Sequence, residues 1–174
     1  MDDLIVREER AEDIEAVRKL NESAFDTRSE ADLVDSLRER GNAVLSLVAV
    51  LDGAVVGHIL FSRIELECST TPPVMPLGLA PMAVDPKFHR QGIGSRLVEV
   101  GLVECHRLGS EVLVVLGHPD FYPRFGFTPA SKFDIRSVYD VPDEVFMALE
   151  LREGALDNCS GVARYAEEFG LVSS

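Results

Sequence analysis

The feature that most constrains the fold is a strand–helix–strand pattern between residues 77 and 116. Leu77–Val84 is apolar over the length of a strand, residues 94–108 carry apolar side chains at helical spacing, and Val112–Leu116 is continuously apolar. A short, continuous apolar run is typical of a strand that is buried on both faces. Because a helix connects the two strands, we expect them to be parallel neighbours in an α/β domain.

The rest of the chain is predicted to add helices and antiparallel strands to this unit. In the first predicted helix, residues 12–25, apolar residues at spacings of three and four place Ile14 and Val17 on one inward face. Asp52-Gly53 is a hairpin signal between two β-branched runs. The other predicted elements are clear from periodicity or from capping residues: a strand at 4–7, a helix over 29–41 with Ser29 as its N-cap, strands at 44–51 and 54–67, and a late strand at 145–151. Together these elements predict a mixed sheet.

We expect a single domain spanning residues 1–174, because this is a typical domain length and no repeat or long linker interrupts it. Cys68, Cys105 and Cys159 are widely spaced and form no Cys-x-x-Cys pair. We therefore expect buried or free thiols in a reducing compartment rather than a zinc site or a disulfide framework. The sequence opens without a signal-peptide pattern and no apolar run approaches ~20 residues, which favours a cytoplasmic location.

The charge distribution separates one segment from the rest of the chain. The net charge of −13 argues against nucleic acid and against an anionic membrane as partners. Residues 86–136 carry seven Lys and Arg against five Asp and Glu, whereas the segments before and after them are net negative. A locally basic segment in an acidic protein favours an anionic ligand at that place.

The turn between the first predicted strand of this unit and its helix has the chemistry of a phosphate site. It has the sequence Arg90-Gln91-Gly92-Ile93-Gly94-Ser95. The first N–H groups of a helix have no intrahelical partner, and the helix dipole adds partial positive charge at that end. Gly92 and Gly94 let a phosphate approach the backbone, and Lys87 and Arg96 add positive charge nearby. The alternative is an ordinary strand–helix turn in which the glycines serve geometry alone.

The same segment resembles the acyl-CoA signature of the GNAT superfamily of N-acetyltransferases, written Q/R-x-x-G-x-G/A. Here the signature is His89-Arg90-Gln91-Gly92-Ile93-Gly94, so His89 replaces the usual Gln or Arg. A second block, Tyr122 to Phe127, is similar to the family's Tyr-x-x-x-Gly-Phe segment. Within the superfamily the chain is most similar to the YhbS-like branch, through the run from Arg90 to Ser95 and the ending Arg124-Phe125-Gly126-Phe127.

The resemblance implies a GNAT-like fold with about six to seven strands, about four helices and splayed parallel strands at 77–84 and 112–116. It implies acetyl-CoA as cosubstrate and no metal ion. The pantetheine arm would enter between the splayed strands and pair with Val84, with the Met82 amide as an oxyanion donor and Tyr122 as general acid. The implied cofactor-binding residues are Met82, Ala83, Val84, His89, Arg90, Gln91, Gly92, Ile93, Gly94, Ser95 and Tyr122. Met82 and Val84 as simple buried strand residues, and Tyr122 as a packing residue, stay open as alternatives.

The resemblance predicts direct transfer of the acetyl group to a primary amine on a small molecule or peptide, without a covalent enzyme intermediate. The general base stays open among Glu65, Glu67, His118, Asp120 and water. A homodimer stays open as the assembly. The alternative function is a catalytically inert acyl-CoA-binding regulatory module. A nucleotide-binding domain is disfavoured, because the chain has no G-x-x-x-x-G-K-[ST] motif and no G-x-G-x-x-G after a strand.

Overall fold

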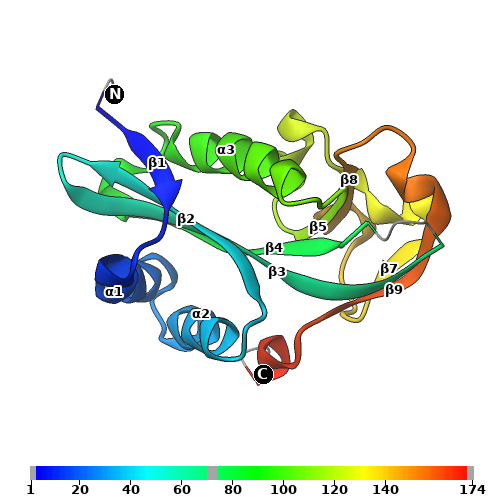
Figure 1. Cartoon of the computed structure of the whole chain (residues 1–174), viewed down its shortest axis with the longest axis horizontal. Helices are drawn as coiled ribbons and strands as arrows, with labels where there is room; N and C mark the ends of the chain where they lie inside the picture. The colour runs from blue at the N-terminus through cyan, green and yellow to red at the C-terminus, as the bar shows by residue number, and fades with distance from the viewer. Residues whose placement is uncertain (1–2, 70–73, 172–174) are drawn as a thin grey trace. The chain divides into compact units, whose positions relative to one another are not determined.

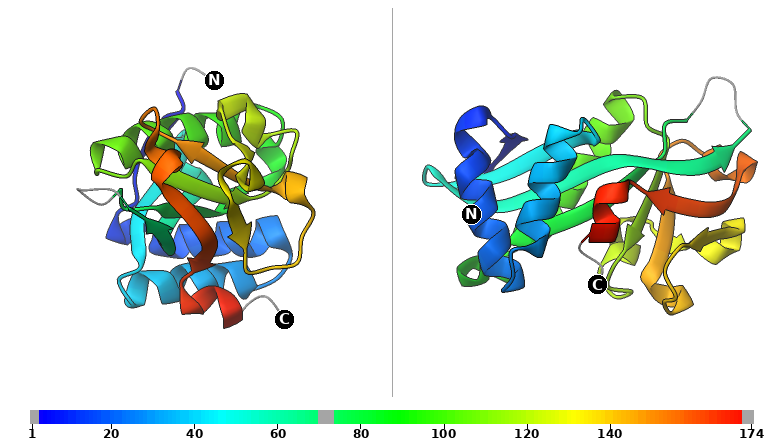
Figure 2. Two further views of the ribbon diagram at one scale, coloured as in Figure 1. Left: turned by 90° about the vertical axis from the view of Figure 1, so that its right-hand side faces the viewer. Right: turned by 90° about the horizontal axis from the view of Figure 1, so that it is seen from below.

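A computed structural model describes residues 3–69 and 74–171 of the chain and shows a mixed α/β fold (Figures 1 and 2). The described residues form three α-helices: α1 (Ile14–Phe25), α2 (Ser29–Glu39) and α3 (Ile93–Arg107). They form nine strands: β1 (Ile5–Glu8), β2 (Ala43–Leu51), β3 (Ala54–Cys68), β4 (Leu77–Val84), β5 (Val112–Leu116), β6 (Thr128–Pro129), β7 (Ile135–Ser137), β8 (Phe146–Glu150) and β9 (Cys159–Tyr165). The predicted mixed sheet is confirmed, with one helix fewer and a few short strands more than expected.

The chain divides into two compact units. The first contains residues 1–61, 81–101 and 167–174, and the second contains residues 62–80 and 102–166. The chain crosses from one unit to the other inside β3, inside β4 and inside α3, so neither unit is a continuous stretch of sequence. A single domain over residues 1–174 stays a prediction.

In the first unit, the strand order is β1-β2-β3-β4. Asp52 and Gly53 both have positive φ, 51° and 81°, and form the tight turn between β2 and β3 that their sequence predicts. Side chains of β3 alternate between two faces. Space at Gly57 is filled by Ile93 of α3, whereas the next residue, His58, lies beside Asn21 of α1. The strands therefore lie between α3 on one face and α1 with α2 on the other (Figure 1).

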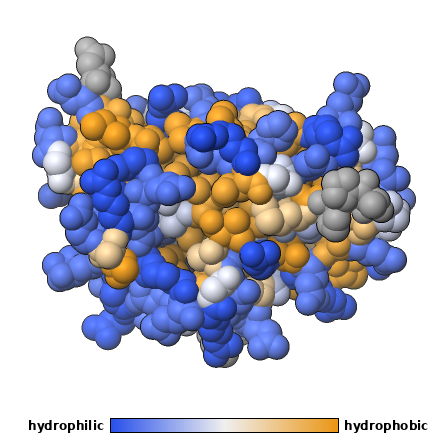
Figure 3. Space-filling model, in the orientation of Figure 1, coloured by the Kyte–Doolittle hydropathy of each residue, from blue (hydrophilic) through white to orange (hydrophobic). Residues whose placement is uncertain are grey.

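In α1, Val17 is buried as expected, but Ile14 is 37% exposed, so its predicted inward position is wrong. Residues Ala11–Asp13 form a separate 3₁₀ turn, so Ile14 is the first residue of α1 rather than a residue inside the helix. The N-cap of α2 is Arg28 rather than Ser29. Hydrophilic residues dominate the surface over α1 and α2 in Figure 3, as amphipathic helices require.

In the second unit, β4 and β5 are parallel, as predicted, with Leu77 opposite Leu113 and Leu79 opposite Val115. The β4–β5 ladder ends at Leu79, before Pro81, although the strand itself continues to Val84. Pro81 does not end the strand, because no hydrogen bond to β5 is required from it. On its other side β5 is antiparallel to β8.

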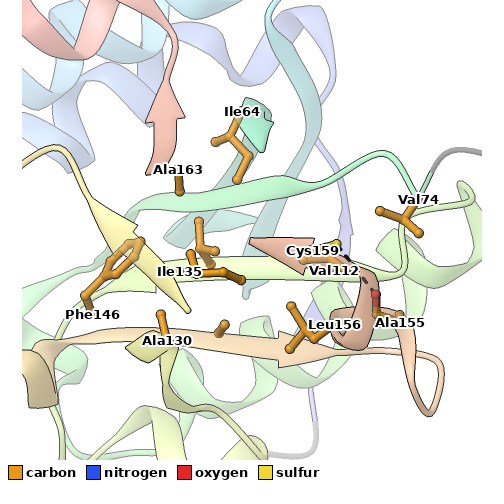
Figure 4. Close-up of a cluster of buried hydrophobic side chains, with 12 residues drawn as sticks. Ile64, Val74, Val112, Ala130, Ile135, Phe146, Ala155, Leu156, Cys159 and Ala163 are labelled. Carbon is orange, nitrogen blue, oxygen red and sulfur yellow. Dashed lines mark hydrogen bonds between the residues drawn. The ribbon is translucent and has the colours of Figure 1, made fainter. Parts of the chain in front are cut away.

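A second core lies in this unit, between β5, β7, β8 and β9 (Figure 4). Its buried residues are Ile64, Val74, Val112, Val114, Ala130, Ile135, Phe146, Ala148, Ala155, Leu156, Cys159 and Ala163. At its edge Cys68 and Cys159 form a disulfide, which corrects the expectation of free thiols there. The two cysteines are 91 residues apart but lie opposite each other in the β3–β9 ladder. Cys105 is free and buried, and burial raises its pKa to about 12.

None of the helices in the described part of the chain is both long and apolar enough to cross a membrane.

Candidate active site

The connection from β4 to α3 is held by side-chain and backbone hydrogen bonds within the first unit. Asp85 donates its N–H to Val56 O at 2.8 Å, which fixes the end of β4 to β3. Its carboxylate accepts the N–H of Lys87 at 2.9 Å and so caps the short 3₁₀ turn Pro86–Phe88. These two hydrogen bonds fix where the loop that leads into α3 begins.

The loop itself adopts two left-handed backbone conformations. Arg90 has φ 61°, which is uncommon for a residue with a side chain and concentrates at functional sites. Gly92 has φ 84°, and a Cβ added there would meet no atom within 4 Å. Arg96 donates its N–H to Gly92 O at 3.0 Å, so the helical hydrogen bonds of α3 begin with that carbonyl. Ile93 and Gly94 open α3 ahead of this bond, at the end of a helix where the first N–H groups have no carbonyl one turn earlier to bond.

Ile93 explains how the loop is anchored. Its side chain is 1% exposed and lies against Gly57 of β3, where an added Cβ would come within 2.9 Å of it. Arg90, Gln91 and Gly92 are exposed, and Gly94 and Ser95 are half-buried. The buried side chain of Ile93 therefore fixes the start of α3 against β3, while the loop before it is exposed to solvent. An anion that binds at a helix N-terminus requires this arrangement.

His89 does not point away from the protein. Its Nε2 lies 3.1 Å from Val84 O and donates to that carbonyl, so the ring connects the loop to the end of β4. In the same strand Met82 and Val84 are half-buried on one face, while Ala83 is 2% exposed on the other. The structure thus brings all the predicted cofactor-binding residues from 82 to 95 together in the first unit.

Tyr122 belongs to the second unit, where it begins the 3₁₀ turn η3 (Tyr122–Phe125) after β5. The residue is 7% exposed, and burial raises its pKa to about 12. Its ring packs edge-on against Phe121 and Phe127, with centroid distances of 4.9 and 5.6 Å. Gly126 ends the turn with φ 99° and reverses the chain, so that Phe127 reaches Tyr122.

The candidate bases are all exposed residues of the second unit. Glu65 and Glu67 alternate onto one face of β3, opposite Arg164 and Ser160 of β9. His118 and Asp120 lie in the loop after β5. The N-cap of η3 is Phe121, so Asp120 is not its capping residue. No cluster of metal-binding side chains occurs among residues 3–69 and 74–171.

A buried polar cluster in the first unit was not predicted from the sequence. Asn21 Nδ2 lies 3.4 Å from His58 Nδ1, and His58 Nε2 lies 2.9 Å from Ser46 Oγ. Ser46 donates its hydroxyl to Glu9, and Glu9 also accepts from Arg38. The residues come from five separate segments without a common motif, so no local signal in the sequence identifies them.

The partners of the two ring nitrogens favour one tautomer of His58. Because Asn21 donates to Nδ1, His58 carries its proton on Nε2 and donates it to Ser46. The imidazole is therefore not available as a base for the Ser46 hydroxyl. Full burial lowers the pKa of His58 to about 3, with a smaller contribution from Arg38. Glu9, Arg38 and Ser46 also line an open cavity of about 350 Å³ in the first unit, with Ile14 on its wall.

Comparisons with known proteins identify the family of this chain. The family described as "Acetyltransferase (GNAT) domain" matches residues 42–129. The uncharacterized N-acetyltransferase YhbS of Escherichia coli K12 is 35% identical over 167 residues, 95% of this chain and 98% of that protein. The uncharacterized N-acetyltransferase YjhQ of the same strain is 39% identical over 135 residues, 76% of this chain and 74% of that protein.

Two solved structures are similar over nearly the whole chain. The first is Escherichia coli YhbS in complex with CoA, with a TM-score of 0.90, 34% identity, and coverage of 96% of this chain and 92% of that one. The second is a GNAT family acetyltransferase from Brucella melitensis in complex with acetyl-CoA, with a TM-score of 0.78, 30% identity, and coverage of 95% and 97%.

Proposed function

The chain belongs to the GNAT family of acetyltransferases, and from this premise we propose that it transfers an acetyl group from acetyl-CoA to a primary amine by direct attack. The observation that carries the proposal is the turn at the start of α3. There a left-handed Arg90 and Gly92 present an outward-facing helix N-terminus with open space at Gly92. CoA and acetyl-CoA bound to two similar structures support the same ligand here.

The residues that would hold acetyl-CoA act mainly through their backbone. The N–H groups between Arg90 and Ser95 suit the pyrophosphate, because helix N-termini bind anions without a dedicated side chain. Val84 offers backbone groups for the pantetheine arm. His89 would act indirectly, since its Nε2 holds the carbonyl of Val84 at 3.1 Å. Acetyl-CoA supplies the activated acetyl group as a thioester.

The chemistry requires a neutral amine, a polarised carbonyl and a proton for the departing sulfur. The amine nitrogen attacks the carbonyl carbon, the C–N bond forms and the C–S bond breaks. The Met82 N–H would stabilise the oxyanion, and the Tyr122 hydroxyl would give its proton to the thiolate. The amine proton leaves to water or to one of Glu65, Glu67, His118 and Asp120. Burial raises the pKa of Tyr122 to about 12, so the phenol carries its proton at neutral pH.

The test is the Tyr122→Phe variant, which keeps the ring packed between Phe121 and Phe127 and removes only the proton donor. We expect kcat to fall by ~10²–10⁴-fold, with nearly unchanged affinity for acetyl-CoA and an unchanged melting temperature. The assay follows release of the CoA thiol with a panel of small-molecule and peptide amines.

Two outcomes would contradict the proposal in different ways. Normal turnover with reduced stability would make Tyr122 a packing residue. A wild-type protein that binds acetyl-CoA but releases no thiol with any amine of the panel would be the inert acyl-CoA-binding module.

A further inference from the structure

The ring of Tyr122 is enclosed by two aromatic rings and by the backbone of a glycine. Phe121 and Phe127 contact it edge-on, at interplanar angles of 81° and 75°. Near the ring edge lies Gly117, the first residue after β5. A Cβ placed on Gly117 would lie 2.4 Å from Cε2 of Tyr122 and 3.0 Å from Cδ2. No side chain fits between the Gly117 backbone and this ring.

Backbone conformation does not explain why glycine occupies position 117. Among the described residues, Gly117 is not one of the glycines with positive φ. Its N–H donates to Val145 O at 2.9 Å, directly after the β5–β8 ladder ends with Leu116 opposite Phe146. The backbone at 117 is therefore held by the sheet and cannot retreat without losing that bond. A side chain added there would move the Tyr122 ring instead.

A second tyrosine, Tyr165, interacts electrostatically with Tyr122. The phenol of Tyr165 is within electrostatic range of Tyr122 and of Tyr139, and these are the three tyrosines of the chain. Tyr165 lies against another glycine, Gly78 of β4, where an added Cβ would come within 2.6 Å of its ring. Tyr165, which interacts electrostatically with Tyr122, is thus itself packed against a glycine of β4.

We propose that Gly117 is a positioning residue for the reaction: by having no side chain, it sets the place of the Tyr122 hydroxyl. The inference rests on the proposed role of Tyr122 as general acid. An ordinary contact begins at 3.4 Å, so a Cβ at 2.4 Å requires the ring to retreat by about 1 Å. A misplacement of ~1 Å at a reacting group is enough to cost roughly 10²-fold in rate.

The test is a double-mutant cycle with Gly117→Ala and Tyr122→Phe. We expect Gly117→Ala to lower kcat by ~10–10²-fold while the KM for acetyl-CoA changes by less than about threefold. In the Tyr122→Phe background the hydroxyl is already gone, so Gly117→Ala should change kcat by less than about threefold. An equal loss of kcat in both backgrounds would overturn the role of Gly117.

Gly101→Ala is the matched control for crowding. An added Cβ at Gly101 would lie 2.7 Å from the ring of Phe61, a similar clash at a place without Tyr122. We expect it to lower the melting temperature comparably and to leave kcat within about threefold of the wild type. If Gly117→Ala alone does not fold, the cycle is measured in a Phe127→Leu background, which opens space beside the ring.

The outcomes distinguish this inference from the proposed function. Wild-type turnover in Tyr122→Phe overturns the general acid and, with it, any residue that positions it. A slow Tyr122→Phe with an additive cycle leaves the acid in place and overturns Gly117 alone.

Discussion

The buried His58 makes the stability of the protein depend on pH in a way that the structure quantifies. Its side chain is fully buried, and the pKa is lowered from 6.5 to about 3, mainly by burial and then by Arg38. In the unfolded chain the imidazole takes up a proton near its ordinary pKa, whereas in the folded protein it stays neutral. The unfolded state therefore binds more protons below about pH 6.5, and the free energy of unfolding falls as the pH falls.

The size of the effect follows from the separation of the two pKa values. Stability from His58 is fully present above about pH 6.5 and declines by ~1.36 kcal/mol for each pH unit below it, down to about pH 3. Between about pH 6.5 and about pH 4.5 the loss is ~3 kcal/mol, a large part of the ~5–15 kcal/mol typical of a folded protein. Asp13 contributes in the same direction only around and below its ordinary pKa of 3.8, because the hydrogen bond from Arg7 lowers its pKa.

The assay is urea unfolding of wild type and His58→Gln at several pH values between about 7.5 and 4.5. Glutamine does not titrate and keeps an N–H donor for Ser46, so the variant should lose ~3 kcal/mol less than the wild type over that range. As a measurement that needs no variant, the NMR titration of the four histidine rings should show one ring that stays neutral down to about pH 4.5. Identical pH slopes in the two proteins, together with four rings titrating near pH 6.5, would refute the reasoning.

Two further predictions concern the cofactor loop. Gly92→Val places a β-branched side chain at φ 84° and over the helix N-terminus, so CoA affinity in calorimetry should fall at least ~10-fold. The control is Gly109→Val, which has φ 96°, equally open surroundings and the same backbone strain. We expect the control to leave CoA affinity unchanged. The His89→Leu variant removes the hydrogen bond to Val84 and should weaken acetyl-CoA binding by ~3–10-fold. The His89→Gln variant keeps a donor and should bind acetyl-CoA like the wild type. Equal affinities in all three proteins would make His89 a surface residue without a role in binding.

The elements with strong periodicity were predictable from the sequence because their signals are local. The strand at Val112–Leu116, the Asp52-Gly53 turn and the helix after the loop all occur within a residue or two of the expected places. The loop from Arg90 to Ser95 could be identified for the same reason, since its glycines, cations and helix start are adjacent in the chain.

The missed features depend on contacts between distant segments. Strand β9 contains Gly161 at φ 96° and several polar residues, so it shows no alternation, yet it brings Cys159 opposite Cys68. The cluster around His58 is assembled from α1, α2, β2, β3 and the residue after β1. Side chains that form hydrogen bonds with one another across five segments produce no sequence pattern within any single segment.

Two glycines show why the residues that hold the start of α3 and Tyr122 in place could not be identified from the sequence. Both Gly57 and Gly117 lie outside the left-handed region, so turn rules say nothing about them. Gly57 admits Ile93 and so fixes the start of α3 in the first unit, and Gly117 admits Tyr122 in the second. In each unit the residue proposed to act is held by a neighbour that has no side chain. Because a missing side chain leaves no hydrophobic or polar signal, the groups proposed to bind and react are easier to identify from sequence than the glycines proposed to position them.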